Sequence, residues 1–367
     1  MSLRRVLIVQ PYGIGDLLFV TPVLRALRLV PSVETVDILL GSRTESVISS
    51  NPHVDEITVI DKDLFHQRTA QANFKEMAAL GKRLRKKKYD LLIDFSLRSE
   101  YGFFSAFFMG IPKRAGFDYK RRGFFHNLRL PLPNGFSNRH VVDYFCDLAE
   151  TAGVKVQDRF LEFYLSEEER KDASYYLNIH KIKKPLVFSL VGGESWGKDA
   201  YFKRWPVRYF AEWVRALRDR LDFDGVVLVG SSGEKILGRE FENSAKVRCA
   251  NLAGEISLAA SAALIEKAVL FAGNDGGLVH LAHALGVPVV AFYGPVDPAV
   301  YGPFPASEEA IAVFKEELAC RPCYQKFRYR SECVGRECLQ ALTPVEVLAF
   351  LDRRKFFDTS RFYSHAG

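Results

Sequence analysis

Long apolar stretches are absent from this sequence of 367 residues. The most apolar ones, such as 103–109 and 287–293, fall far short of the ~18 residues that suggest a membrane-spanning helix. Cysteine is scarce as well, since six residues in the whole chain are too few for a scaffold held by disulfides. The first residues carry Arg4 and Arg5 but then only a short apolar run, which favours a strand over a secretory signal. We therefore expect a globular protein of the cytoplasm.

Low-complexity tracts and short repeats are missing too, and a composition of 48% hydrophobic and 26% charged residues is that of an ordinary globular protein. At roughly 100–200 residues per domain, the length allows two or three domains. Apolar runs of strand length alternate with helical patterns, which favours βα units and parallel sheets. The predicted strands form two series, 5–10, 36–40, 57–60 and 90–95, then 186–190, 225–229, 269–272 and 287–292.

This doubling predicts an α/β protein with two Rossmann-like, doubly wound domains. A cap-like Ser166-Glu167-Glu168-Glu169 sequence opens a helix between the two series. We predict domains over residues 1–175 and 176–367. Because such sheets bind ligands at the carboxyl ends of their strands, two of them in tandem predict a central cleft that both face.

Positive charge is concentrated in one segment. The net charge is +7, but residues 82–139 hold 14 Lys or Arg against 4 Asp or Glu, a local balance of +10. Clusters of this kind attract the phosphates or carboxylates of nucleic acids, anionic lipids or acidic sugars. A solvated helix face explains the run at 82–88 equally well.

The first predicted strand is followed by the turn Gly13-Ile14-Gly15-Asp16. This turn is not the dinucleotide-binding fingerprint, because Leu18 stands where the third glycine belongs. Asp16 lies where a helix begins. It can be a helix cap or a general base that reaches a substrate hydroxyl.

The second domain contains two further glycine-bearing turns. Gly192 and Gly193 follow its first strand, and Lys203 precedes the next helix. The sequence Gly-Asn-Asp-Gly-Gly-Leu-Val-His occupies residues 273–280. Small residues at a strand-to-helix junction expose backbone N–H groups, which suits a diphosphate. The structural alternative is that Asp275 only caps the helix and that its histidine is a packed helix residue.

Five blocks, taken together and in order, resemble a known family. They are Gly13-x-Gly15-Asp16, Lys203-Arg204-Trp205-Pro206, Asn251-Leu252-Ala253-Gly254-x-x-Ser257-Leu258, Asn274-Asp275-Gly276-Gly277-x-x-His280-Leu281-Ala282 and Gly294-Pro295-x-Asp297-Pro298. Over nearly the whole chain they are similar to the bacterial ADP-heptose–lipopolysaccharide heptosyltransferases, glycosyltransferase family 9. The resemblance implies a GT-B fold and an inverting transfer of heptose from ADP-heptose to the inner core of lipopolysaccharide, without a required metal or other cofactor.

The resemblance also implies roles for single residues. Asp16 matches the catalytic base, Lys203 the lysine that binds the donor diphosphate, and Glu234 an acid that binds the donor ribose. The donor site is completed by the phosphate-binding loop and the glycine turn, which contribute Asp275, Gly276, Gly277, His280, Gly192 and Gly193. The family usually has threonine where Gly276 stands, which removes one hydroxyl donor to the diphosphate.

The basic segment is then expected to serve the acceptor, through Lys113, Arg114, Arg121 and Arg122. A membrane-anchored acceptor with phosphates and acidic sugars explains this charge and predicts peripheral contact with the anionic inner membrane, at its cytoplasmic face. Nucleic acid is not expected as a partner, because no recognition motif accompanies the charge. The last helix could pack back on the N-terminal domain.

Two other functions stay open. The chain can be a family member that uses another nucleotide-sugar donor, or a non-catalytic protein that binds sugar nucleotides or the lipopolysaccharide core. Asp16 discriminates between catalysis and binding, since a binding protein has no reason to present a base there.

Four of the six cysteines gather near the C-terminus, at positions Cys320, Cys323, Cys333 and Cys338. Their spacing permits a tetrahedral thiolate site for structural zinc, although it is looser than that of a zinc ribbon. Structural zinc, reduced thiols and disulfides are the three alternatives.

Overall fold

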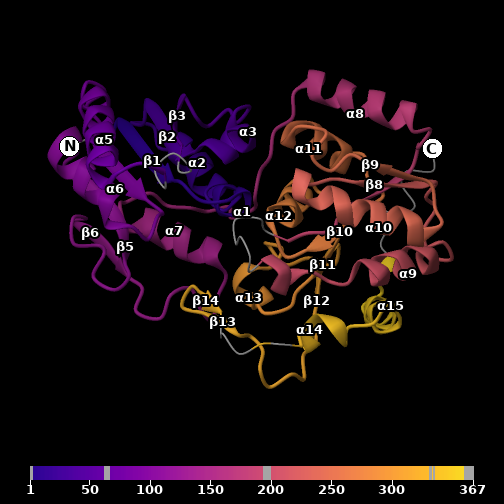
Figure 1. The fold of residues 1–367 in the computed structure, drawn as a ribbon. Helices are drawn as coiled ribbons and strands as arrows, with labels where there is room; N and C mark the ends of the chain where they lie inside the picture. Colours follow the sequence, from indigo (N-terminus) through magenta and orange to yellow (C-terminus); the bar gives the residue numbers. More distant parts are fainter. Residues whose placement is uncertain (1–2, 62–66, 193–199, 330–332, 334, 359–367) are drawn as a thin grey trace. The chain divides into compact units, whose positions relative to one another are not determined.

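Figure 1 shows the computed structural model of the chain as a ribbon. The structure describes residues 3–61, 67–192, 200–329, 333 and 335–358. The chain divides into two compact units, Met1–Tyr164 (unit 1) and Leu165–Gly367 (unit 2).

In the described residues, unit 1 holds a parallel sheet with the strand order β3-β2-β1-β4-β5-β6 (Figure 1). Its strands are β1 (Arg5–Gln10), β2 (Thr35–Gly41), β3 (Glu56–Ile60), β4 (Leu91–Asp94), β5 (Lys113–Asp118) and β6 (Leu128–Pro131). Its helices are α1 (Ile14–Leu18), α2 (Thr21–Arg28), η1 (Ser42–Thr44), α3 (Glu45–Ile48), α5 (Ala70–Arg85), α6 (Ser99–Phe104), the π-helix η2 (Ser105–Met109) and α7 (Val141–Thr151). The central strands read as continuous apolar runs because helices cover both faces of the sheet.

Unit 2 repeats this arrangement with the strand order β12-β11-β10-β7-β8-β9. The strands of its parallel sheet are β7 (Pro185–Ser189), β8 (Gly225–Leu228), β9 (Cys249–Asn251), β10 (Leu270–Asn274), β11 (Val289–Phe292) and β12 (Ala310–Val313). Its helices are α8 (Glu167–Ile179), α9 (Val207–Leu217), η4 (Ser232–Glu234), α10 (Lys235–Ala245), α11 (Leu258–Glu266), α12 (Gly277–Ala284), α13 (Pro298–Tyr301), α14 (Glu337–Gln340), α15 (Pro344–Arg353) and η5 (Phe356–Asp358). A short hairpin of β13 (Tyr324–Gln325) and β14 (Arg328–Tyr329) follows the sheet.

Both sheets have the same doubly wound order, since each starts in the middle, adds two strands to one side and then three to the other. This confirms the predicted α/β class. The order reverses between β1 and β4 in unit 1 and between β7 and β10 in unit 2. Ligands of doubly wound sheets bind at the carboxyl ends of the strands at such a switch point.

Two details differ from the sequence-based expectation. The helix predicted over residues 17–29 is divided into α1 and α2, because Pro22 lies in the first turn of a new helix and lacks the N–H that a continuous helix needs. Strands β5, β6, β9 and β12 were not predicted. In β5 and in the edge strand β6, charged residues such as Lys113 and Arg129 interrupt the short apolar pattern.

The C-terminal part of the described chain packs within unit 2. Helix α15 lies against α9, and η5 buries Phe356 and Phe357 in the same core. Within the described ranges, none of the helices combines the length and the apolarity that crossing a membrane requires.

Candidate active site

Asp16 lies beside the switch point of unit 1. β1 ends at Gln10, the chain turns at Gly13, and α1 begins with Ile14. Oδ2 of Asp16 accepts a hydrogen bond from the N–H of Gly13 at 3.1 Å, and Nε2 of Gln10 donates to the carbonyl oxygen of Asp16 at 3.2 Å. The half-buried carboxylate is therefore held in one place by a capping contact.

A buried acid–histidine pair lies at the end of the neighbouring strand. Oδ2 of Asp94, the last residue of β4, is 3.1 Å from Nε2 of His126, and the N–H of Ser96 donates to Oδ1 at 2.9 Å. Both Asp94 and His126 are buried. Burial raises the pKa of Tyr12 to about 12, and the charges of Asp94 and Asp16 add to this rise. Tyr12 is therefore protonated near neutral pH. Of the two carboxylates near it, Asp94 is fully buried and Asp16 is only half-buried, so Asp16 is the more accessible.

A buried ion pair occupies the corresponding edge of unit 2. Nζ of Lys203 lies 2.7 Å from Oδ2 of Asp275, and the two side chains are only 5% and 6% exposed. Burial raises the pKa of Asp275, and the Lys203 ammonium opposes that rise. Since an unpaired buried charge costs several kcal/mol, each group depends on the other. The structure thus brings two separate sequence motifs into direct contact.

Asn274 fixes the lysine-bearing segment to the sheet. Its Oδ1 accepts a hydrogen bond from the N–H of Trp205, and its Nδ2 donates to the carbonyl oxygen of Leu190, both at 2.7 Å. The Trp205 ring stacks on Phe292 with 4.1 Å between centroids and 10° between planes. These contacts set the position of Lys203, two residues earlier, near the ends of β7 and β10.

Glu234 lies over the turn that follows β8. Its Oε2 accepts a hydrogen bond from the N–H of Val191 at 3.3 Å, and the side chain is buried. Gly230 adopts a φ of +148°, and a Cβ atom there would lie 2.2 Å from Oε2 of Glu234. The glycine is therefore required by both its backbone conformation and the close carboxylate.

The junction between β10 and α12 carries the predicted phosphate loop. α12 begins with Gly277, directly after Gly276, and His280 is buried in the same helix. Gly192 approaches this junction so closely that a Cβ atom would lie 2.4 Å from the carbonyl oxygen of Asp275. Small residues thus line the N-terminus of α12, where N–H groups and the helix dipole favour an anion.

Except for Gly193, which lies outside the described residues, the predicted donor residues lie along the carboxyl edge of one sheet, at the ends of β7, β8 and β10 or in the segments that follow them. They are Gly192, Lys203, Glu234, Asp275, Gly276, Gly277 and His280.

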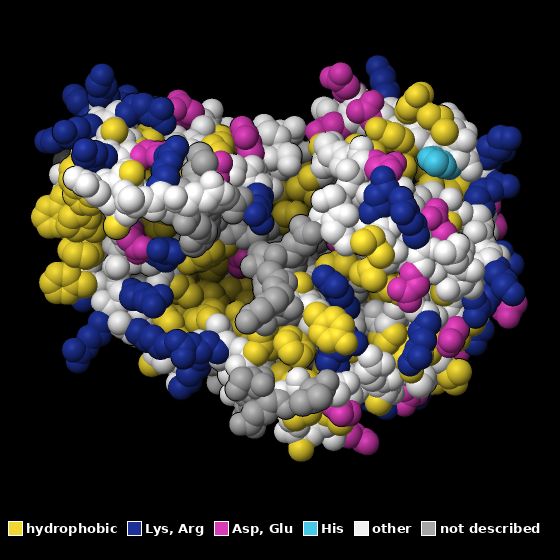
Figure 2. Space-filling model, viewed as in Figure 1, with side chains coloured by type: hydrophobic (Ala, Val, Ile, Leu, Met, Phe, Trp, Pro, Cys, Tyr) yellow, Lys and Arg dark blue, Asp and Glu magenta, His cyan; other side chains and the backbone are white. Residues whose placement is uncertain are grey.

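The predicted acceptor residues belong to unit 1, on β5 and on the loop before β6. Lys113, Arg121 and Arg122 are exposed. Arg114 differs, because its Nε donates to the carbonyl oxygen of Phe125 at 2.9 Å and its NH1 to other carbonyl oxygens of this region. Figure 2 shows Lys and Arg side chains on both sides of an apolar patch at the edge of unit 1 that carries α5 and α6.

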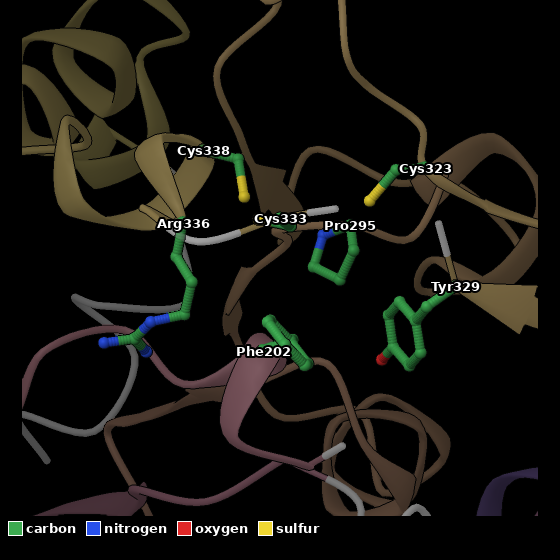
Figure 3. A pocket seen from close by; sticks show the side chains of 7 residues that line it. All are labelled: Phe202, Pro295, Cys323, Tyr329, Cys333, Arg336 and Cys338. Carbon is green, nitrogen blue, oxygen red and sulfur yellow. The ribbon is translucent and has the colours of Figure 1, made fainter. Parts of the chain in front are cut away.

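Three of the four C-terminal cysteines line one cavity of about 20 Å³, the size of a single water molecule. These are Cys323, Cys333 and Cys338, and Figure 3 shows how they lie with the other lining residues, which are Phe202, Pro295, Tyr329 and Arg336. Burial raises the pKa of Cys338 to about 11.

Cys320 is exposed and does not line this cavity. Among the described residues, no group of three or more His, Cys, Asp or Glu side chains is placed to hold one metal ion. The structural zinc site considered from the spacing therefore stays a prediction, and an apolar cavity with two aromatic side chains in its wall lies among three of the thiols.

Comparison with known proteins gives the family. A family model of glycosyltransferase family 9 (heptosyltransferase) matches residues 77–331, which is more than half of the chain. This chain belongs to glycosyltransferase family 9. Lipopolysaccharide heptosyltransferase 2 of Escherichia coli K12 is 27% identical over 365 residues, covering 95% of this chain and 97% of that protein.

Solved structures of family 9 glycosyltransferases have the same fold. The E. coli ADP-heptose lps heptosyltransferase II superposes with a TM-score of 0.72 at 25% identity, covering 95% of this chain and 98% of that one. A family 9 glycosyl transferase from Veillonella parvula superposes with a TM-score of 0.77 at 20% identity, covering 98% and 99%. These likenesses, with the two doubly wound sheets, confirm the predicted GT-B fold and the identification as a glycosyltransferase.

Sequence reasoning missed two groups that shape the site of this family 9 enzyme. Asn274 belongs to a recognised motif, but its hydrogen bonds to both neighbouring segments depend on the tertiary fold. The pair of Asp94 and His126 carries no motif at all. Its sequence signals are two glycines, Gly116 on β5 and Gly102 on α6, at which a Cβ atom would lie 2.6 Å and 2.9 Å from the His126 ring.

Replacing Gly230 with alanine is expected to destabilise this glycosyltransferase by about 1–3 kcal/mol more than replacing Gly153, because the new Cβ displaces the Glu234 carboxylate. Gly153 is a matched control, since its φ is also positive, at +86°, but no atom lies within 4 Å of its Cβ position. Chemical denaturation of both variants measures the difference. Equal losses would show that the close carboxylate imposes no constraint.

Proposed function

We propose that this enzyme transfers heptose from ADP-heptose to the inner core of lipopolysaccharide, with inversion at the anomeric carbon. The observation that carries the proposal is the chemistry at the two switch points. A half-buried carboxylate, Asp16, lies at one, and the buried cation of Lys203 lies beside a glycine-rich helix N-terminus at the other. The printed names of the relatives, lipopolysaccharide heptosyltransferase 2 and ADP-heptose lps heptosyltransferase II, support this donor and acceptor.

The donor is bound by unit 2 in this proposal. Lys203 and the N–H groups at Gly276 and Gly277 contact the diphosphate, and Glu234 accepts hydrogen bonds from the ribose hydroxyls. As the bond between the anomeric carbon and the nucleotide breaks, negative charge grows on the leaving diphosphate. Fixed positive groups stabilise the transition state, in which this charge has developed, more than they stabilise the ground state. They therefore lower the barrier to transfer. The mechanism needs no metal ion for this step.

Asp16 acts on the acceptor. Its carboxylate takes the proton from the attacking hydroxyl, which approaches the face of the sugar opposite the leaving group and thereby inverts the configuration. The hydrogen bond from Gly13 and the start of α1 stabilise the ionised carboxylate, the form that a base requires. Gln10 holds the main chain of the same residue.

The basic residues of unit 1 attract the acceptor. Lys113, Arg121 and Arg122 present exposed charge to its phosphates and acidic sugars, whereas Arg114 stabilises the backbone that carries them. The acceptor is anchored in a membrane, so we place the enzyme in peripheral contact with the cytoplasmic face of the anionic inner membrane.

The proposal is tested first by thermal shift with ADP, UDP, GDP and CDP. A ligand at a hundredfold excess over its Kd adds about 2.7 kcal/mol to the free energy of unfolding. For a unit of this size, this raises the melting temperature by roughly 5–10 °C. We expect ADP to give the largest shift. Mass spectrometry should then detect heptose on a heptose-free core acceptor after incubation with ADP-heptose.

The same experiment separates the alternatives. A larger shift with another nucleotide and transfer from its sugar would identify a different donor. A shift with ADP but no product on any core acceptor would identify a binding protein without catalysis.

A further inference from the structure

Three phenylalanines on unit 1 are unusually exposed. Phe74 on α5 is 48% exposed, Phe107 on η2 is 63% exposed, and Phe124 in the loop before β6 is 71% exposed. A contiguous group of large apolar side chains on a surface marks a site of interaction.

Ring contacts join these side chains into one surface. Phe103 lies 6.5 Å from Phe74 and 5.0 Å from Phe107 between ring centroids. Phe125 lies 6.0 Å from Phe107 and 5.3 Å from Phe124. We name these five residues the aromatic ridge. Three segments that are distant in sequence contribute to it.

The aromatic ridge rests on the hydrophobic core of unit 1. Phe104 and Met109 are buried in the core of unit 1, and Phe103 and Phe108 pack against the same core. A Cβ atom at Gly81 of α5 would lie 2.7 Å from Cβ of Phe108, so the helix and η2 are in close contact. The exposed rings are therefore presented by a packed scaffold.

Positive charge surrounds the ridge. Exposed Lys82 and Arg85 follow Gly81, the α5 residue whose Cβ position contacts Phe108 of η2, and exposed Arg121 and Arg122 lie three and two residues before Phe124. Figure 2 shows this arrangement as an apolar patch with Lys and Arg on both sides. The nearby acids are already neutralised, because Glu76 pairs with Arg68 and Glu100 with Arg98.

We propose that the aromatic ridge inserts into the interfacial region of a bilayer that contains anionic phospholipids, while the surrounding Lys and Arg bind the headgroups. Apolar rings flanked by cations are the pattern that binds such an interface. A second copy of the chain fits less well, since a two-fold interface would bring the same positive charges together. The inference deepens the proposed function, on which it rests for its biological reason, and identifies the surface that contacts the membrane.

The rings also argue against nucleic acid. Phe103 and Phe125 meet at 72°, Phe107 and Phe125 at 78°, and Phe124 and Phe125 at 86°. Phe125 thus meets three neighbouring rings edge to face, and these rings form one packed group, whereas binding to single strands uses separate open faces on which successive bases stack.

The test is co-sedimentation of the full chain with vesicles of phosphatidylcholine alone or with 30% phosphatidylglycerol. We expect binding to the anionic vesicles, and an at least tenfold lower partition coefficient for Phe107→Ser/Phe124→Ser. Ile236→Ser/Val345→Ser is the matched control, because both side chains are 76% exposed and lie in unit 2. This control should bind like the wild type.

A second arm isolates the charge. Lys82→Glu/Arg85→Glu should weaken binding to anionic vesicles by more than about tenfold at low salt, and high salt should reduce this difference. Wild type that does not bind anionic vesicles, or a ridge variant that binds as well as wild type, would overturn the proposal. So would a dimer that the ridge variant dissociates, or tighter binding to single-stranded DNA than to vesicles.

Transfer to a deacylated core acceptor separates this inference from the proposed function. The ridge variant should keep wild-type turnover on that acceptor, because the ridge contacts lipid only. Vesicle binding by an enzyme that transfers no heptose would refute the proposed function and leave the ridge assignment intact.

Discussion

Replacing Asp16 with asparagine is expected to lower heptose transfer by about 10²–10⁴-fold, the usual contribution of a general base. The affinity for ADP should stay within a few-fold of wild type, because the donor residues lie in unit 2. Asparagine has nearly the same shape, and its amide oxygen can still accept the capping-box hydrogen bond from the N–H of Gly13. Stability should therefore be preserved.

Asp16→Ala completes the comparison, since it removes both the base and the cap. We expect the alanine variant to lose transfer like the asparagine variant, and in addition about 1 kcal/mol of stability. Turnover is measured with ADP-heptose and a core acceptor, and stability by thermal unfolding. An asparagine variant that keeps more than a tenth of wild-type turnover would leave Asp16 as a cap alone.

Lys203→Ala is expected to weaken ADP binding by about 10–100-fold, the value of a charged hydrogen bond to phosphate, and to leave adenosine binding unchanged. The same change leaves Asp275 buried without its partner, which costs about 3–5 kcal/mol. In the single variant, a loss of ADP binding can therefore come either from the missing contact with the diphosphate or from the loss of stability.

The double variant Lys203→Ala/Asp275→Asn removes both charges and separates the two effects. Thermal stability should return toward wild type, because no uncompensated ion stays buried. Affinity for ADP, measured by calorimetry, should stay low. Recovery of ADP affinity in the double variant, or an equal loss for adenosine, would assign Lys203 to the structure of unit 2 and not to the diphosphate.

The central strands could be predicted because each is a short apolar run bounded by glycine, proline or charge. β1, β7 and β10 lie within a residue or two of their predicted ranges. Strand β5 and the edge strand β6 could not be predicted, since charged and partly exposed residues leave their apolar pattern incomplete.

The site residues could be named from sequence, but their contacts could not. Asp16 and Lys203 stand next to glycine or aromatic residues in a recognisable order. The pairing of Lys203 with Asp275 depends on the stacking of Trp205 and on the hydrogen bonds of Asn274, which involve segments far apart in sequence. The aromatic ridge was missed because phenylalanines in a sequence are read as core. Only the exposed fractions separate Phe107 from its buried neighbours.

The stacked Trp205 makes part of the molecule visible to spectroscopy. The three tryptophans of the chain, Trp196, Trp205 and Trp213, all belong to residues 165–367. Trp205 and Trp213 are fully buried against Phe292 and Phe188. Fluorescence excited at a wavelength that only indole absorbs therefore monitors unit 2 alone, whereas the circular dichroism of the backbone monitors both units. A single sample can report whether the two units melt together or in sequence, without any engineered label.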